Sequence, residues 1–231
     1  MSKDLPLFYV PELNSERFQY LVGDEATHGI RVLRLEVDDE ILITDGRGRM
    51  SSGVIASKSK RSLDFELLED LEPEHKEPGF HLAIAPTKNM DRLEFCVEKC
   101  IEIGLGKLSL VICQNSERRQ VRVDRLQKIA ISAMKQSRAA FLPDISEPLP
   151  ISDFISHERS EDLFIAHCRT GEREFLKSNS SPACLLIGPE GDFTESEIEE
   201  AVANGAKPVH LGPKRLRTET AAIVGCTLMN L

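Results

Sequence analysis

Apolar and polar residues follow two different rhythms along this chain. In the first third, Glu40–Thr44 and residues 63–67 alternate at period two, which is typical of strands with one buried face. Asp45 and Gly46, directly after the first of these segments, are a strong signal for a hairpin turn. From residue 80 onward, short apolar runs alternate with segments that repeat at helical spacing. The pattern therefore predicts a small β domain followed by an α/β region.

The α/β region contains alternating candidates for strands and helices. Strands are predicted over residues 80–85, 108–113, 163–166, Ala183–Ile187 and 209–211. Helices are predicted over residues 91–103, 123–140, 172–177, 194–204 and from Thr218 onward. Strands that alternate with helices in this way predict a mainly parallel sheet with helices on both faces, so the fold class is α/β.

Residues that begin and end helices support several of these elements. Thr194 and Glu197 have the spacing of a capping box at the start of one helix, and Gly205 is placed to end it. Thr218 is expected to cap the last helix through its hydroxyl group.

The β domain is expected to contain one short helix over residues 25–33. Asp24 precedes it and is expected to cap it. Ile30 and Leu33, three residues apart, would then face the core of this domain.

A boundary between two domains is predicted at residues 72–78. This stretch, EPEHKEP, is polar and flanked by proline, which favours a linker. The domains are therefore expected to comprise residues 1–72 and 79–231.

Composition narrows the environment in which the protein works. No apolar run approaches the ~20 residues that a helix needs to cross a bilayer, and the N-terminus lacks the apolar core of a signal peptide. Six cysteines are scattered without a C-x-x-C pair, so neither disulfides nor a zinc site is expected. These features favour a reducing, cytoplasmic location, without a membrane or a metal.

Charge is distributed unevenly, although the formal net charge is −9. Residues 46–63 carry five basic side chains and no acidic one, and residues 207–217 carry four and none. Residues 107–138 carry eight basic and two acidic side chains. This segregation predicts one basic face that suits a nucleic acid. A set of unrelated solvated charges remains the alternative.

Two glycine-containing turns follow two of the predicted strands. Residues 188–191, GPEG, come after one strand, and Gly212 with Pro213 come after the next. Such turns form a pocket at the carboxyl edge of a parallel sheet, where α/β proteins usually bind ligands. The sequence contains no P-loop, no dinucleotide-binding fingerprint and no G-x-S-x-G elbow. From spacing alone, two tight turns in an α/β core are an equally good interpretation.

Longer motifs resemble a known family. LLIGPEGDFTESEIEEA and LGPKRLRTETA closely resemble the RsmE family of SPOUT methyltransferases, which methylate N3 of a uridine in 16S ribosomal RNA with S-adenosylmethionine. PTKNMDRLEFCVEKCIEIGL, KQSRAAFLP and RVLRLEVDDEILITDGRG are similar to further parts of that family, so the resemblance covers most of the chain. The sequence departs from the family at two positions. Asp192 directly follows GPEG, where the family more often has a further glycine. Residues 135–137 read KQS, where the family more often has EQS.

The resemblance implies an architecture and partners. It implies an N-terminal PUA-like RNA-binding β-barrel domain and a SPOUT-type parallel sheet, with the last helix threaded through a loop to make a trefoil knot. The expected partner is 16S ribosomal RNA or the small ribosomal subunit. A homodimer is expected too, because the last helix carries apolar residues on more than one face.

The resemblance also implies residues for the site. Arg217 and Glu219 are the candidates for catalysis, because N3 of uridine must lose a proton before it can be methylated. Glu190 is a third candidate for catalysis, although a structural role is favoured for it. The lone histidines His28, His167 and His210 are expected to be structural. The cofactor pocket is expected to involve Leu186, Ile187, Gly188, Gly191, Leu211, Gly212, Leu216, Thr218 and Ala221. RNA contacts are expected from Arg31, Arg34, Arg118 and Arg138.

Three alternatives stay open. Another SPOUT activity, such as ribose 2′-O-methylation, would use the same cofactor pocket. A non-catalytic RNA-binding module would explain the basic segments but not the cofactor loops. A nucleotide-binding regulator would explain the loops, although the usual nucleotide fingerprints are missing.

Overall fold

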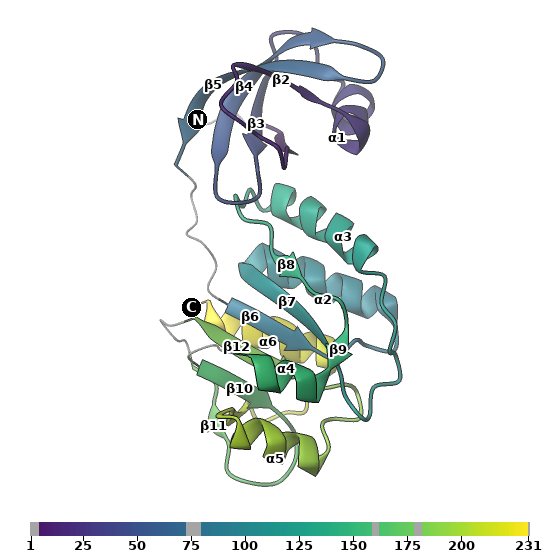
Figure 1. Ribbon diagram of the computed structural model, residues 1–231, viewed down its shortest axis with the longest axis vertical. Coiled ribbons are helices and arrows are strands. Elements are labelled where there is room, and N and C mark those ends of the chain that lie inside the picture. The colour runs from purple at the N-terminus through teal and green to yellow at the C-terminus, as the bar shows by residue number, and fades with distance from the viewer. Residues whose placement is uncertain (1–4, 73–79, 159–161, 178–181, 231) are drawn as a thin grey trace. The chain divides into compact units, whose positions relative to one another are not determined.

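The computed structural model describes residues 5–72, 80–158, 162–177 and 182–230. The chain forms two compact units (Figure 1). One comprises Met1–Glu77 and Met134–Leu142, and the other comprises Pro78–Ala133 and Pro143–Leu231. The linker predicted at residues 72–78 lies outside the described residues, apart from Glu72.

The first unit is built on a five-stranded sheet in the order β1-β3-β4-β5-β2. Its strands are β1 (Leu7–Tyr9), β2 (Phe18–Leu21), β3 (Glu40–Thr44), β4 (Met50–Lys58) and β5 (Leu63–Leu71). β3 and β4 form the predicted hairpin, and Gly46 in its turn has φ +73°. A Cβ atom there would lie 2.8 Å from the ring of Tyr9, so the turn requires glycine. The inward positions of the alternating strands, among them Ile41, Ile43 and Phe65, form the core.

The helix of the first unit differs from the prediction. α1 (Gly23–Thr27) continues into a π-helical turn, η1 (His28–Leu33), and Asp24 does not cap it, because no side chain caps this helix. Ile30 packs against the core as expected, but Leu33 is exposed and Leu35 is buried instead. A π-helical turn has more residues than an α-helical one, so the 3.6-residue spacing no longer predicts which side chain points inward.

Residues 134–142 complete the first unit. α3 (Val123–Gln136) ends four residues before the predicted position, and Arg138 follows in the left-handed region with φ +57°. The carbonyl group of Ala140 then accepts hydrogen bonds from Thr44 Oγ1 at 3.2 Å and Gly48 N at 3.0 Å. Ala140 is buried against Leu7 and Met50. This stretch is therefore part of the core of the first unit.

The second unit contains a larger sheet in the order β11-β13-β10-β12-β6-β7-β8. Every pairing in it is parallel, so the prediction of a mainly parallel sheet is confirmed. Its strands are β6 (Phe80–Ile84), β7 (Leu105–Ile112), β8 (Asp144–Ile145), β10 (Asp162–Ala166), β11 (Glu174–Phe175), β12 (Ala183–Ile187) and β13 (Lys207–His210), and β9 (Leu149–Pro150) pairs with β7. The two central strands, β6 and β12, are buried along their whole length, which explains why β12 is entirely apolar and β6 is apolar apart from His81.

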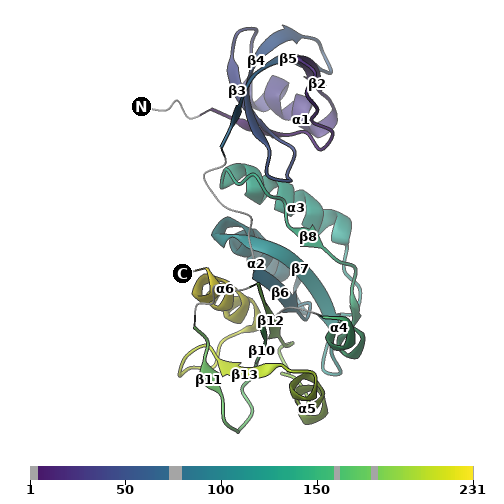
Figure 2. The same ribbon diagram turned by 60° about the vertical axis from the view of Figure 1, so that its left-hand side comes forward.

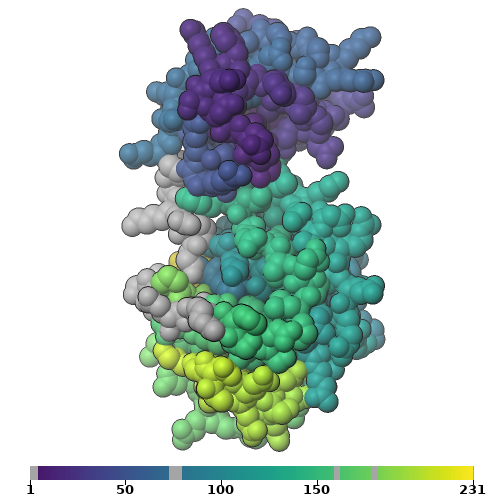
Figure 3. Space-filling view, in the orientation of Figure 1, coloured from purple at the N-terminus to yellow at the C-terminus, as the bar shows by residue number. Residues whose placement is uncertain are grey.

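Helices cover both faces of this sheet. α2 (Met90–Ile103) and α6 (Thr218–Met229) pack together on one face, and α4 (Ile151–His157) and α5 (Glu195–Ala203) lie on the other (Figures 1 and 2). The residues of α4 and α5 form much of the surface of the second unit that faces the viewer in Figure 3.

Two segments of the second unit correct the sequence interpretation. The helix predicted over residues 172–177 is wrong, because Glu174 and Phe175 form β11 and pair with β13. Six residues are too few to stabilise a helix alone, and β13 offers them backbone partners. α4 was not predicted, although Ile151, Phe154 and Ile155 have the i, i+3, i+4 spacing of a buried helical face.

Of the two caps predicted for the last two helices, one is confirmed and one is wrong. The capping box of α5 is confirmed, since Thr194 N donates to Glu197 Oε2 at 2.8 Å and Glu197 N donates to Thr194 Oγ1 at 3.2 Å. Thr218 does not cap α6, because Arg217 occupies the capping position. The Thr218 hydroxyl group instead donates to the carbonyl oxygen of Gly188 at 3.1 Å.

Candidate functional site

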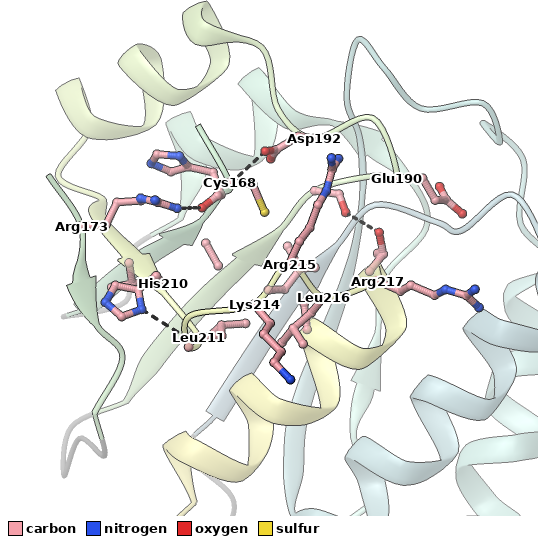
Figure 4. A pocket seen from close by; sticks show the side chains of 18 of the residues that line it. Cys168, Arg173, Glu190, Asp192, His210, Leu211, Lys214, Arg215, Leu216 and Arg217 are labelled. Carbon is pink, nitrogen blue, oxygen red and sulfur yellow. Dashed lines mark hydrogen bonds between the residues drawn. The ribbon is translucent and has the colours of Figure 1, made fainter. Parts of the chain in front are cut away.

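A cavity of about 830 Å³ lies at the carboxyl ends of β10, β12 and β13 (Figure 4). This volume is within the range of small-molecule sites, and the position is the usual one for ligands of parallel α/β sheets. Three loops and the start of α6 line it: Ala166, His167, Cys168 and Arg173; Ile187, Gly188, Pro189, Glu190 and Asp192; and Val209 to Thr218 with Ala221.

The loop after β12 is fixed by contacts from other segments. Glu190 Oε1 accepts a hydrogen bond from Lys88 N at 2.9 Å, which agrees with the structural role expected for Glu190. Asn115 Nδ2 donates to the carbonyl oxygens of Gly191 at 3.3 Å and Asp192 at 3.0 Å. A Cβ atom on Gly191 would lie 3.1 Å from Asn115, so the contact favours glycine. The backbone of this wall is therefore held in place before any ligand arrives.

The loop after β13 carries most of the positive charge of the cavity. Gly212 has φ +135°, which favours glycine, and its N–H donates to His210 Nδ1 at 3.3 Å. Lys214 and Arg215 extend in opposite directions from this loop in Figure 4. Arg217 extends away from Cys168.

The third wall, after β10, contains a polar corner that we define as His167, Cys168, Arg173 and Asp192. Asp192 has φ +64°, and its two carboxylate oxygens accept from Cys168 N and Phe193 N, each at 2.8 Å. Arg173 Nη1 donates to the carbonyl oxygen of His167. Burial and then the nearby Arg173 lower the pKa of His167, which favours the neutral imidazole.

Most of the residues expected for the cofactor line the cavity. They are Ile187, Gly188, Leu211, Gly212, Leu216, Thr218 and Ala221. Leu186 instead lies in the core, where it is paired with Ala83 of β6, and Gly191 packs against Asn115. Arg173, which is not among the expected residues, also lines the cavity, as do His167 and His210, for which a structural role is expected. Their positions at or after the ends of strands were the available signal, because ligands bind at that edge.

The two catalytic candidates lie in different surroundings. Arg217 lines the cavity. Glu219, in the first turn of α6, is buried, and its Oε1 lies 3.7 Å from Nη1 of Arg92 on α2. Its other oxygen has no hydrogen-bond partner in the described part of the chain. The structure thus brings Arg217 to the cavity and places Glu219 against α2.

The four arginines expected to contact RNA fall into two pairs, one of exposed side chains and one of side chains that donate hydrogen bonds to backbone carbonyl groups. Arg31 and Arg34 are exposed in the first unit. Arg118 donates through Nε and Nη2 to the carbonyl oxygen of Lys88 at 3.2 and 2.8 Å. Arg138 donates to the carbonyl oxygen of Leu5 at 3.5 Å.

A second polar cluster lies away from the cavity. His81, Glu158 and Cys184 bring potential metal ligands within 4.8 Å of one another. His81 already uses both ring nitrogens, one with Glu158 Oε2 at 3.1 Å and one with Ser109 Oγ at 2.9 Å.

None of the helices in the described ranges is long and apolar enough to cross a membrane.

Comparisons with known proteins match this arrangement. A family model described as an RNA methyltransferase domain matches residues 75–230, and one described as an RNA methyltransferase PUA domain matches residues 21–68. Ribosomal RNA small subunit methyltransferase E of Rickettsia conorii is 29% identical, over 91% of this chain and 88% of its own. The corresponding protein of Buchnera aphidicola is 27% identical, over 99% and 94%.

Solved structures agree along nearly the whole chain. A probable rRNA methyltransferase from Porphyromonas gingivalis is 38% identical with a TM-score of 0.87, over 96% of this chain and 95% of that one. Ribosomal RNA small subunit methyltransferase E from Neisseria gonorrhoeae, bound to S-adenosyl methionine, is 27% identical with a TM-score of 0.84 over the same shares. Since the family model spans more than half of the sequence and the relatives align with most of it, the chain belongs to the RsmE family of RNA methyltransferases.

Proposed function

We propose that this protein methylates N3 of a uridine in 16S ribosomal RNA with S-adenosylmethionine. The observation that carries the proposal is the cavity at the carboxyl ends of β10, β12 and β13, lined largely by residues of the loops that follow these strands. The relative from Neisseria gonorrhoeae, which shares this fold, contains S-adenosyl methionine.

The lining of the cavity fits such a cofactor. Leu211, Leu216 and Ala221 provide an apolar surface for a purine ring. Gly188 and Gly212 carry no side chains of their own, so the remaining backbone donors and acceptors of these two turns can recognise the edge of the ring through hydrogen bonds. A volume of about 830 Å³ leaves room for both the cofactor and the target base.

The chain itself must position the base and stabilise charge. S-adenosylmethionine supplies an activated methyl group. N3 of uridine carries a proton and becomes nucleophilic when that proton leaves, so negative charge develops on the base. Arg217 is the cavity residue that we assign to stabilise this charge. Glu219 remains a candidate for the proton acceptor, although its contact with Arg92 favours a positioning role.

Further expectations belong to the same proposal. Residues 1–72 would act as the RNA-binding domain, with Arg31 and Arg34 contacting phosphates, and residues 79–231 as the methyltransferase domain. The last helix would pass through a loop to form the trefoil knot. The enzyme would act as a homodimer in the cytoplasm, on 16S ribosomal RNA or the assembled small subunit.

Nucleoside analysis tests the proposal directly. The purified protein would be incubated with S-adenosylmethionine and either naked 16S RNA or small subunits from cells that lack the gene. Mass spectrometry of the digested RNA should find 3-methyluridine at one site. The appearance of 2′-O-methyluridine would instead indicate the ribose-methylating alternative. Unmodified RNA, together with no calorimetric signal for S-adenosylhomocysteine, would contradict the proposal.

A further inference from the structure

The polar corner of the cavity contains two nitrogen atoms to which the described part of the chain offers no hydrogen bond. His167 Nδ1 and Arg173 Nε are buried, and neither has a hydrogen-bond partner among the described residues. His167 as a whole is only 8% exposed, yet it lines the cavity. Arg173 Nε always carries a hydrogen, and His167 Nδ1 carries one in one of the two neutral tautomers. A buried donor without an acceptor is unfavourable, so this corner would gain stability from a ligand that supplies an acceptor.

A negative charge lies in the same corner. Each carboxylate oxygen of Asp192 accepts one backbone N–H, from Cys168 or from Phe193. An ionised carboxylate has about four acceptor sites, so Asp192 can still accept from a cationic group. The corner therefore presents a guanidinium group and a carboxylate on the two sides of Cys168 (Figure 4).

This pairing of charges is complementary to a zwitterion. An α-amino acid carries a carboxylate and an ammonium group on one carbon atom. The carboxylate needs donors, which the Arg173 guanidinium and the His167 ring can supply, and the ammonium needs an acceptor. The loop after β13, with Leu211 and Leu216, offers the less polar surface on which the rest of such a ligand would lie.

We propose that Arg173, His167 and Asp192 bind the amino-acid end of the cofactor, with Arg173 on its carboxylate and Asp192 on its ammonium group. This inference rests on the proposed function and deepens it, because it assigns one end of the ligand to one corner. The opposite end, the purine, then lies against the backbone of the turns at Gly188 and Gly212.

The conformation of Asp192 supports a built site. Aspartate is one of the few residues that tolerate the left-handed region at low cost. Its carboxylate fixes the Cys168 backbone while Arg173 fixes the adjacent His167 carbonyl group. The groups that would bind the ligand thus also hold the loop that carries them.

Calorimetry with three ligands tests the assignment. S-adenosylhomocysteine has the complete amino-acid end, its decarboxylated derivative keeps only the amine, and 5′-methylthioadenosine has neither group. Arg173→Gln should weaken binding of S-adenosylhomocysteine about tenfold or more, as expected for the loss of a charge-assisted hydrogen bond. The same variant should bind the other two ligands within about twofold of the wild type.

Asp192→Asn provides an independent test. Asparagine also tolerates the left-handed region and keeps one acceptor oxygen, so the loop should remain folded. This variant should weaken both ligands that carry the amine and leave 5′-methylthioadenosine nearly unchanged. Lys207→Gln is the matched control, because Lys207 is an exposed residue of β13 that does not line the cavity, and its loss should change none of the affinities.

The outcomes separate the two proposals. If the wild type binds none of the three ligands, the proposed function is wrong. If it binds all three equally, or if Arg173→Gln weakens all three by the same factor, the function stands and the assignment of the corner is overturned. Selective loss of the carboxylate-bearing ligand supports the assignment.

Discussion

Arg217 both lines the cavity and begins the last helix. Its side chain lines the cavity, and its backbone occupies the capping position of α6 without a side-chain cap. Replacement of the side chain therefore leaves the start of the helix intact, because the hydrogen bond from Ala221 N at 2.8 Å goes to the carbonyl oxygen of Arg217. This residue can be tested for chemistry without disturbing the fold.

Arg217→Ala should lower the rate of methyl transfer by about a hundredfold or more, as the loss of one preorganised donor commonly does. Affinity for S-adenosylhomocysteine should change little. Arg217→Lys should restore only part of the rate, since a point charge cannot replace a planar guanidinium. Single-turnover methylation at saturating cofactor measures this. A near-normal rate in the alanine variant would exclude Arg217 from the chemistry.

His167 should make the folded state sensitive to acid. Burial is the largest cause that lowers the pKa of His167 in the folded protein below the ordinary value of 6.5, and the positive charge of Arg173 is the second. Below that value the unfolded chain binds more protons than the folded one, so the free energy of unfolding falls as the pH falls. Asp192 opposes this effect and Arg169 adds to it. His167→Gln should therefore lose less stability than the wild type when thermal unfolding is compared above and below pH ~6.5. An equal loss of stability in the variant and the wild type would show that His167 is not the source of the sensitivity to acid.

Among the elements, α5 shows how a short motif fixes a helix that supports the cavity. Glu197 is buried and accepts from Thr194 N through Oε2 and from Gln114 N, at 2.7 Å, through Oε1. The capping box thus also connects α5 to the loop after β7. Phe193, directly before the cap, is fully buried.

Thr194→Ala should reduce the free energy of unfolding by about 1 kcal/mol, the usual effect of losing such a cap. Thr227→Ala is a suitable control, because Thr227 is exposed near the end of α6 and alanine favours helices. Urea denaturation of the three proteins measures the difference. Equal midpoints for Thr194→Ala and wild type would show that the capping box adds nothing.

Local sequence patterns predicted the elements whose burial shows directly in the order of their own apolar residues. β3 and β12 have the predicted bounds because alternation and uninterrupted apolar runs reflect their burial directly. β11 could not be predicted, since two residues form a strand only where β13 lies beside them. The contact that joins Asp192 to Cys168 has the same origin, because it spans 24 residues of sequence and no local pattern predicts it.

At the scale of the whole molecule, α6 has more apolar surface than the described residues bury. Cys226 and Met229 are buried, whereas Ile223, Val224 and Leu228 are only partly covered. A second copy of the chain would cover them, which is the basis for expecting a homodimer.

Light scattering at micromolar concentration should therefore report about twice the 25.8 kDa mass of one chain. Leu228→Arg should shift the mass toward that of one chain, because a charge in an apolar interface is not compensated. Val202→Arg, on the exposed side of α5, should leave the mass unchanged. A wild-type mass near 25.8 kDa would exclude the dimer under these conditions.

The contribution of residues 134–142 to the first unit affects when this unit can finish folding during synthesis of the chain. Domains generally fold as units during synthesis, the N-terminal one first. Here Ala140 supplies a buried methyl group beside Leu7 and a carbonyl group for Thr44 and Gly48. When residue 77 leaves the ribosome, the first unit therefore still lacks part of its core. It becomes complete only after two strands and two helices of the second unit have also been translated.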